Sequence, residues 1–263
     1  MHVQLNLAVD STFDAAYARF ALRRRPIGTV IDVGASNGSW TGLSYRHFPG
    51  AKWLLIEGLP AHEEILSQFV NQAPNIQYEM VLAGNRDGEA HLFLGPDNFG
   101  GAAHSRASEG QTVPRPMRSI DSLVAQHKLP GPYFIKLDTH GFEREILEGA
   151  RETLKGTNLV LLEVYNFELG PGIARFAEMC AHMETLGFRC VDVVDPLRRT
   201  SDGALWQWIC CLSRSRRPCS SGRSGSGNCP LCPHRCFCLF PSAIMRCFGN
   251  KTAYFHSVFI VFL

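Results

Sequence analysis

A short apolar run that ends in a glycine-rich turn constrains the fold of this chain more than any other feature. The run covers Thr29 to Val33, and the turn follows directly from Gly34 to Gly38. An apolar run of this length next to glycines is typical of a buried strand. Because a helical pattern begins at Ser39, the segment predicts a strand, a tight turn and a helix in succession.

The same alternation of strands and helices continues along the chain. Strands are expected at residues 29–33, 53–57, 76–82, 90–94, 133–138, 158–164, 188–194 and 205–209, and helices at 10–25, 39–47, 60–71, 119–123, 142–154 and 172–186. The run from Leu159 to Leu162 is apolar without alternation, as in parallel strands that are covered on both faces. The pattern therefore predicts an α/β fold with a mostly parallel sheet.

Three connecting segments carry predictions of their own. The turn at residues 85–88 indicates a hairpin between the strands on either side of it. Residues 95–118 are rich in Gly, Pro and Ser, and a loop of this length is typical of a lid or a binding loop. Arg23 to Arg25 directly precede Pro26, which should end the first helix. We therefore expect the three arginines to lie in the last turn of that helix, where cations are favoured.

The glycine turn is the first candidate binding site. A strand that ends in glycines and opens a helix lets the backbone approach a ligand and aims N–H groups at its anionic part. The dinucleotide fingerprint G-x-G-x-x-G is absent, because Gly34 and Gly38 are four residues apart with Ser36 between them. Glu57 ends the next strand, 23 residues after Gly34, where a carboxylate can accept ribose hydroxyls.

A second segment, from Phe134 to Ala150, resembles the signature of the FkbM family of S-adenosylmethionine-dependent methyltransferases. The matching residues are Lys136, Asp138, Gly141, Glu143, Ile146, Leu147, Gly149 and Ala150, and those of the cofactor segment are Asp32, Val33, Gly34, Ala35 and Gly38. The elements 119–123 and 161–164 also look like family features, so the resemblance spans about residues 13–207.

The resemblance implies a Rossmann-like class I methyltransferase fold, with a mostly parallel seven-stranded sheet flanked by helices and its last strand inserted between the two strands before it. S-adenosylmethionine would then be bound by Asp32, Gly34, Ala35, Ser36, Asn37 and Gly38, with Glu57 on the ribose. The candidate catalytic residues are Asp138, His140 and Glu143, and His104 on the long loop is a further candidate base. His140 and Glu143 also have structural alternatives, as a packing residue and as a residue of the first helical turn.

A metal ion is an alternative at the same strand ends. Asp138, Glu163 and Asn166 offer the oxygen ligands that Mg²⁺ prefers. Isolated carboxylates at strand ends are common, so the sequence assigns no metal site and leaves Mg²⁺ as a hypothesis.

Charge and cysteine content divide the chain in two. All 24 acidic residues lie at or before Asp202, whereas residues 203–263 carry seven basic residues and no acid, and eight of the ten cysteines lie from Cys210 onward. A net negative body with two cysteines favours a cytoplasmic protein without a nucleic-acid partner. The N-terminal residues resemble no signal peptide, and the apolar run at the C-terminus is too short to span a membrane. The oligomeric state cannot be read from the sequence.

The basic segment leads us to divide the chain into a methyltransferase domain, residues 1–207, and an atypical Cys- and Arg-rich tail, residues 208–263. Cys229, Cys232, His234, Cys236 and Cys238 have residue types that bind zinc, but they lie within ten residues. The alternative is a frameshift or a disordered tail. Related sequences often continue with Met-Asp-Leu, and the loss of one base from such codons can read Trp208-Ile209-Cys210. Composition and spacing favour the frameshift.

The function predicted from these observations is S-adenosylmethionine-dependent O-methylation of a hydroxyl on a sugar, a glycan or a polyketide-like metabolite. Two alternatives remain at this stage. One is an NAD(P)-binding oxidoreductase, which the missing third glycine disfavours. The other is a catalytically impaired methyltransferase-like fold with a zinc-binding tail.

Overall fold

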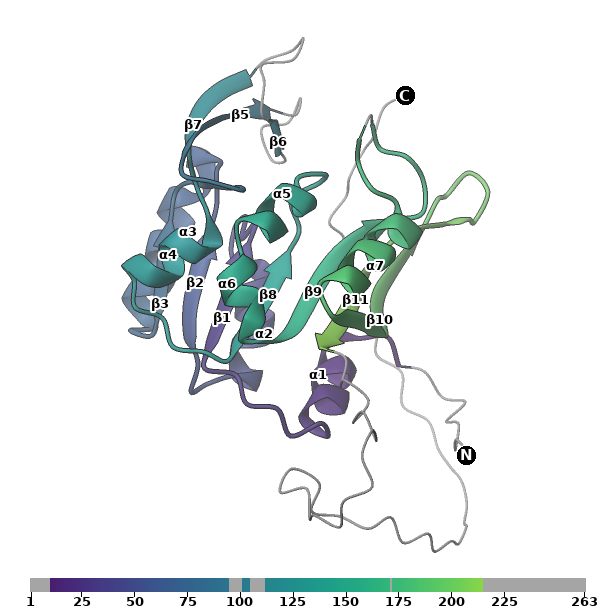
Figure 1. Ribbon diagram of the computed structural model, residues 1–263, viewed down its shortest axis with the longest axis horizontal. Helices are drawn as coiled ribbons and strands as arrows, with labels where there is room; N and C mark the ends of the chain where they lie inside the picture. The colour runs from purple at the N-terminus through teal and green to yellow at the C-terminus, as the bar shows by residue number, and fades with distance from the viewer. Residues whose placement is uncertain (1–9, 95–100, 105–111, 171, 215–263) are drawn as a thin grey trace, which may run out of the picture. The chain divides into compact units, whose positions relative to one another are not determined.

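The computed structural model describes residues 10–94, 101–104, 112–170 and 172–214. The chain divides into two compact units, residues 1–217 and 218–263, and every described residue belongs to the first unit. A seven-stranded sheet runs through this unit in the order β10-β11-β9-β8-β1-β2-β3 (Figure 1). Its strands are β1 (Thr29–Val33), β2 (Lys52–Ile56), β3 (Ile76–Glu79), β8 (Tyr133–Leu137), β9 (Thr157–Tyr165), β10 (Phe188–Arg198) and β11 (Leu205–Arg214).

The sheet is mostly parallel. β1 pairs in parallel with β2 and β8, β2 with β3, and β8 with β9. β11 is antiparallel to both β9 and β10, so the last strand lies between its two predecessors. This arrangement confirms the fold class that the sequence predicts, including the insertion of the last strand.

Helices cover both faces of the sheet. One hydrophobic cluster joins α1 (Phe13–Ala21), α2 (Ser39–Ser44) and α3 (Glu63–Gln72) to strand residues such as Trp53 and Phe134. The other joins α4 (Ile120–Gln126), α5 (Glu143–Glu148), α6 (Arg151–Lys155) and α7 (Phe176–Thr185) to Ile31 and Ile135. Successive side chains of a strand point to opposite faces, which explains why the central strands are apolar throughout. None of the helices in the described ranges combines the length and the apolar character needed to cross a membrane.

The predicted hairpin and the predicted long loop are both wrong in part. β4 (Leu82–Ala83) pairs with β7 (Thr112–Arg118) and not with β5 (Gly88–Leu94), so a second sheet has the order β4-β7-β5-β6, with β6 at Gly101–His104. β7 lies inside the segment expected to be a loop. Its prolines, Pro114 and Pro116, are two residues apart, so their missing N–H groups fall on one edge of the strand and leave the other edge able to pair with β5.

Two helices end earlier than the sequence predicts. α1 begins after Thr12, whose side chain accepts a hydrogen bond from Ala15 N, but it ends at Ala21, so Arg23 to Arg25 follow the helix and are not in its last turn. The helix expected at 142–154 is two helices, α5 and α6, divided at Gly149. The carbonyl of Gly149 accepts a hydrogen bond from Asp121 N. The carboxylate of Asp121 in turn accepts from Glu152 N at 2.9 Å and from Thr153 N at 2.8 Å. These two bonds satisfy N–H groups in the first turn of α6, so α6 begins as a separate helix.

β11 continues past the division expected after residue 207. Trp208 to Leu212 are all buried, and the strand pairs on one side with β9 and on the other with β10 as far as Ser213. The described chain ends with this strand at Arg214. Residues 208–214 of the expected tail thus form part of the sheet, and the rest of it, residues 215–263, lies outside the described residues together with the candidate zinc ligands.

The break at Gly149 can be tested by adding one methyl group. A Cβ at Gly149 would lie 2.0 Å from the carbonyl oxygen of Gly84, so one of the two backbone segments would have to shift. We expect Gly149→Ala to lower the free energy of unfolding by about 1 to 3 kcal/mol in urea denaturation of the full chain. Gly50→Ala is the control, because nothing lies within 4 Å of a Cβ there. Equal stability of the two variants would contradict the close approach.

Candidate active site at the carboxyl edge of the sheet

The turn after β1 packs directly against the end of β8. Gly34, Ser36 and Gly38 all have positive φ angles, of 74°, 50° and 77°. A Cβ at Gly34 would lie 2.1 Å from the carbonyl oxygen of Asp138, so only glycine permits this approach. The glycine turn and the segment that begins at Asp138 are therefore one continuous structure.

Most N–H groups of the turn are already hydrogen-bonded within the protein. Gly34 N and Ala35 N donate to the carbonyl of Ile56, Gly38 N donates to the carbonyl of Ala35, and Ser36 N donates to Glu57. The expectation that these N–H groups point at an anionic ligand is wrong for these four residues, because the turn folds back against the end of β2.

Glu57 is held rigidly beside this turn. Its Oε2 accepts from Ser36 N at 2.8 Å and its Oε1 accepts from Leu59 N at 2.7 Å. A carboxylate has about four lone-pair sites, so two backbone donors leave capacity for hydroxyl groups. The side-chain oxygen of Asn37 accepts a hydrogen bond from the N–H of Ser39, the first residue of α2.

The predicted cofactor residues differ in how far they are exposed to solvent. Gly34, Ser36 and Asn37 are half-buried, whereas Ala35 and Gly38 are buried. Asp32 has no exposed surface: its Oδ2 accepts from Thr41 Oγ1 at 2.6 Å, and its Oδ1 lies 3.1 Å from Lys136 Nζ. Asp32 thus contacts the turn indirectly, through Lys136, and has no surface that a ligand could reach.

Lys136 joins the two predicted segments. Its Nζ donates to the carbonyl of Gly34 at 2.8 Å and lies 3.1 Å from Asp32 and 3.4 Å from Asp138. Its side chain is only 4% exposed. Burial acts to lower the pKa of Lys136, but the two carboxylates outweigh burial and raise the pKa above its usual range. The ammonium is therefore charged at neutral pH.

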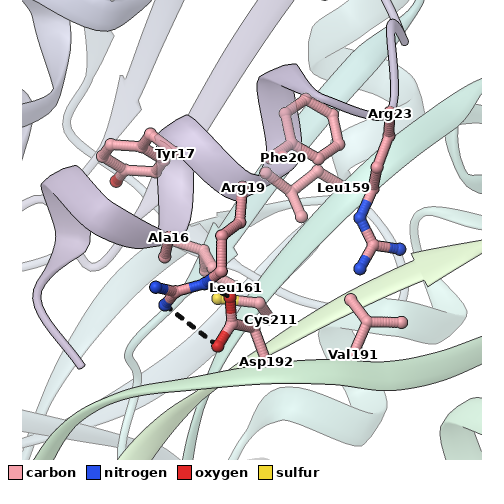
Figure 2. A pocket seen from close by; sticks show the side chains of 10 residues that line it. All are labelled: Ala16, Tyr17, Arg19, Phe20, Arg23, Leu159, Leu161, Val191, Asp192 and Cys211. Atoms are coloured by element: carbon pink, nitrogen blue, oxygen red, sulfur yellow. Dashed lines mark hydrogen bonds and ion pairs between the residues drawn. The ribbon is translucent and has the colours of Figure 1, made fainter. Parts of the chain in front are cut away.

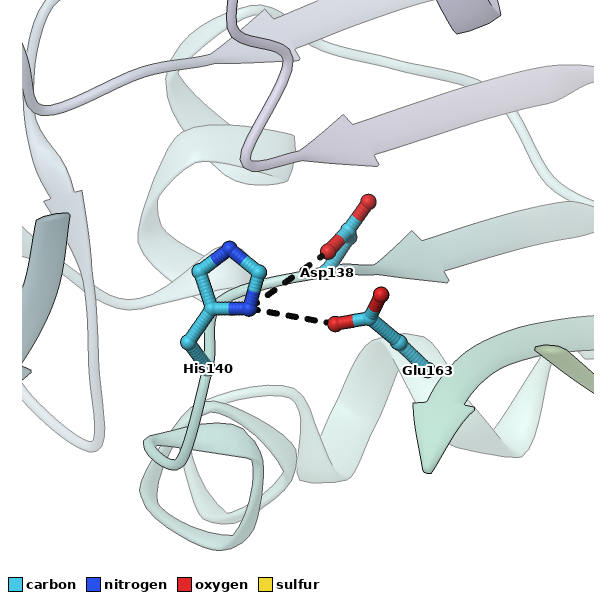
Figure 3. A group of neighbouring side chains, drawn as sticks. All are labelled: Asp138, His140 and Glu163. Carbon is cyan, nitrogen blue, oxygen red and sulfur yellow. Dashed lines mark ion pairs between the residues drawn. The ribbon is translucent and has the colours of Figure 1, made fainter. Parts of the chain in front are cut away.

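Asp138, His140 and Glu163 form a cluster next to this ion pair (Figure 3). His140 Nδ1 lies 3.1 Å from Glu163 Oε2 and 4.0 Å from Asp138 Oδ1. It also lies 2.7 Å from the hydroxyl of Tyr165, which donates a short hydrogen bond to Glu163 Oε2. The cluster is formed by the segment after β8 and the end of β9.

The groups of the cluster shift one another's pKa values. Burial acts to lower the pKa of His140, but the hydrogen bond to Glu163 and the charges of Asp138 and Glu163 raise it to about 9. Burial raises the pKa of Glu163 to about 7, and the charge of Asp138 adds to this shift. For Asp138, the cations Lys136 and His140 outweigh burial and lower the pKa. Perturbed values of this kind are typical of functional sites.

Glu143, the third predicted catalytic residue, holds the loop that carries His140. Its Oε1 accepts from Gly141 N at 3.0 Å and from Thr139 Oγ1 at 3.1 Å, and the side chain is buried. His140 and Gly141 have positive φ angles of 56° and 120°, so this carboxylate stabilises an unusual backbone conformation.

The structure brings together a different set of candidate metal ligands from the set suggested by the sequence, which was Asp138, Glu163 and Asn166. The ligand atoms of Asp138, His140 and Glu163 all lie within 4.8 Å of one another. Asn166 is not part of this set, and its Nδ2 donates to the carbonyl of Leu205. The side chain of His104, the further candidate base, lies outside the described residues.

Three residues of the site were not predicted from the sequence as site residues: Lys136, Tyr165 and Gln207. Gln207 donates from Nε2 to Glu163 Oε1 at 2.7 Å. One signal for Lys136 was available, since a charged residue in an otherwise apolar strand needs a buried partner. Tyr165 and Gln207 carried no such signal.

A hollow among the described residues lies apart from this site (Figure 2). Side chains of α1, β9, β10 and β11 line it, mainly Ala16, Tyr17, Phe20, Leu159, Leu161, Val191 and Cys211, together with Arg23, which follows α1. The pair of Arg19 and Asp192, 2.5 Å apart, is part of its wall. Leu159 and Leu161 precede Glu163 on β9, so the hollow lies away from the carboxyl edge of the sheet.

The sheet order, the glycine turn and the polar cluster at the carboxyl edge define a class I S-adenosylmethionine-dependent methyltransferase. The sequence matches the Methyltransferase FkbM domain over residues 32–190, and the chain belongs to this family. S-adenosylmethionine is accordingly its methyl donor, and the oxidoreductase alternative is set aside.

Solved structures with a similar fold are distant in sequence. A precorrin-6y C5,15-methyltransferase from Geobacter metallireducens is 15% identical, with 76% of this chain and 86% of that chain covered and a TM-score of 0.42. The magnesium protoporphyrin IX methyltransferase of Synechocystis PCC 6803, solved with bound SAM, is 11% identical, with 77% of each chain covered and a TM-score of 0.43. No curated protein matches the sequence.

The role of Lys136 can be tested through stability. Lys136→Met leaves the fully buried Asp32 without its cation, so we expect the free energy of unfolding to fall by about 3 to 5 kcal/mol. Lys155→Met is the matched control, since Lys155 and Glu152 form a surface pair that is 71% and 72% exposed and worth less than about 1 kcal/mol. Urea denaturation of both variants measures the difference. A small loss in Lys136→Met would show that the ion pair is not needed.

Proposed function

We propose that this methyltransferase transfers the methyl group to a hydroxyl of a sugar, a glycan or a polyketide-like metabolite. The observation that carries the proposal is the cluster of Asp138, His140 and Glu163 beside the glycine turn. A hydroxyl acceptor loses its proton when it is methylated, and a base within reach assists that loss. The cluster supplies such a base at the edge where ligands of parallel α/β sheets bind.

The residues around the turn suit the methyl donor. Gly34 and Gly38 fix the conformation of the turn, because a Cβ at Gly34 would clash with Asp138 and one at Gly38 with Phe69. Glu57 beside the turn keeps lone pairs for further donors. In this proposal the turn from Gly34 to Gly38 holds the methionyl part and Glu57 accepts the ribose hydroxyls. When bound, S-adenosylmethionine supplies an electrophilic methyl group. The protein's own contribution is to position the two reactants.

His140 and Glu163 act together as the proton acceptor in this proposal. They share the contact between Nδ1 and Oε2, so a proton taken from the acceptor belongs to the pair. Asp138 keeps its negative charge near the pair, which favours the protonated imidazole that forms. Glu143 keeps His140 in place through the loop.

The remaining parts of the proposal concern location and partners. We propose a cytoplasmic enzyme, supported by four cysteines that carry free thiols: Cys180, Cys190, Cys210 and Cys211. The partner is then a small-molecule or glycan acceptor and not a nucleic acid. We also keep the division into a methyltransferase body and a Cys- and Arg-rich tail as a proposal.

His140 provides the direct test. Mass spectrometry with labelled cofactor first identifies an accepted hydroxyl compound. We then expect His140→Asn to lower kcat by about 10² to 10⁴-fold, with unchanged binding of S-adenosylhomocysteine in calorimetry. Asn tolerates the positive φ at this position, and His47→Asn, on the surface beside Asp14, is the control. Full activity of His140→Asn would refute the proposed base.

The pH dependence has a defined sign. A base must be unprotonated to act, so kcat/KM should rise with pH. The midpoint should lie above the ordinary value of 6.5 and towards about 9, because Glu163 and Asp138 raise the pKa of His140. In Glu163→Gln the midpoint should fall towards 6.5, since the carboxylate is gone. A rate that falls with increasing pH in this range would point to a different chemistry.

A chelator distinguishes this mechanism from the magnesium hypothesis. Lys136 already places a positive charge next to Asp138, so we expect EDTA to leave methyl transfer unchanged. Loss of activity in EDTA with recovery on addition of Mg²⁺ would instead make Asp138, His140 and Glu163 a metal site.

A further inference from the structure

Gln207 reaches the site from the last strand of the sheet. It stands opposite Tyr165 in the antiparallel register of β11 and β9, so Gln207, Tyr165 and Glu163 share one face. Its Nε2 donates to Glu163 Oε1 at 2.7 Å. Both residues are buried: 8% of the surface of Gln207 and 7% of that of Glu163 is exposed. The contact joins residues that are 44 positions apart in the chain.

The two oxygens of Glu163 have different partners. Oε2 faces His140 Nδ1 and accepts from Tyr165, whereas Oε1 accepts from Gln207. A carboxylate bound through both oxygens cannot rotate about its last bond without losing a hydrogen bond. A buried acceptor left without a donor costs about 1 to 3 kcal/mol, which favours this single orientation. Gln207 therefore determines where Oε2 lies relative to His140.

We propose that Gln207 is a positioning residue for methyl transfer, which holds Glu163 against His140 and so allows the last strand to complete the base. This inference rests on the proposed function, in which the pair of His140 and Glu163 accepts the proton. Gln207 acts through Glu163 and does not itself take part in proton transfer.

Charged and titratable groups from several elements face His140. Among them are Asp138 after β8, Glu163 and Tyr165 on β9, and Glu143 on α5, and Lys136 on β8 is paired with Asp138. Gln207 is the neutral member of this environment. Removing its donor and adding a charge at its position should therefore shift the titration of His140 in opposite directions.

The experiment measures the titration of His140 by NMR in the full-length protein labelled at histidine, with His140→Asn used to assign the signal. No acceptor is needed. In Gln207→Met, Glu163 loses the donor that holds it, and the midpoint of His140 should fall by about one pH unit or more. In Gln207→Glu, a second carboxylate lies beside Glu163, and the midpoint should rise.

A control variant separates positioning from general damage to the strand. Ser213→Ala changes a buried residue near the other end of β11, where Ser213 Oγ donates to the carbonyl of Asn158 at 3.4 Å, and it should leave the midpoint unchanged. If Gln207→Met does not fold, Gln207→Glu alone decides, because a rise in the midpoint requires the carboxylate contact. An unchanged midpoint in Gln207→Glu, or the same shift in Ser213→Ala, overturns the inference.

Kinetics with the identified acceptor distinguishes this inference from the proposed function. We expect Gln207→Met to lower kcat by up to about 100-fold with little change in KM. If His140→Asn is fully active, the proposed function fails. If His140→Asn is inactive while Gln207→Met has the kcat and the titration of the wild type, only the role of Gln207 fails.

Discussion

The buried ammonium of Lys136 is the interaction on which the rest of the site depends. A charge that is nearly excluded from water must be surrounded by opposite charges and dipoles. Here Asp32, the carbonyl of Gly34 and Asp138 provide them, from β1, the turn after β1 and the end of β8. None of these groups can move independently, so the position of the glycine turn also fixes the position of the polar cluster.

The register of the parallel strands decides which side chains meet. Asp32 stands opposite Lys136, and Lys136 stands opposite Leu161. Glu163, two residues after Leu161, therefore points to the same face as Lys136, at the end where the strands finish. A slip of one residue would send Lys136 or Glu163 into the opposite hydrophobic cluster, so the same apolar residues that determine the register also bring the polar groups together.

The site combines a rigid part and a part with mobile protons. The turn from Gly34 to Gly38 uses most of its N–H groups internally and offers a fixed shape. The pair of His140 and Glu163 has pKa values of about 9 and about 7, so its protons can move near neutral pH. The methyl transfer to a hydroxyl that we propose would need both properties, because the reactants must be aligned and a proton must leave. In our further inference, the last strand contributes to the second part through Gln207.

Much of this molecule follows from local patterns in the sequence. The apolar runs at β1, β2, β8 and β9, the turn at Gly34 and the sequence resemblance around Asp138 together predict the fold class and the presence of Asp138 and His140 at the carboxyl edge of the sheet, where we propose that ligands bind. Local patterns were misleading for β7, because Pro114 and Pro116 normally disfavour strands and only the pairing with β5 shows that one edge remains usable. They also gave no sign of Tyr165 and Gln207. The contact between Gln207 and Glu163 joins two strands that become neighbours only because β11 inserts between β9 and β10. Periodicity and turn chemistry act within a few residues and could be read from the chain, whereas hydrogen bonds between distant strands exist only after the sheet has formed.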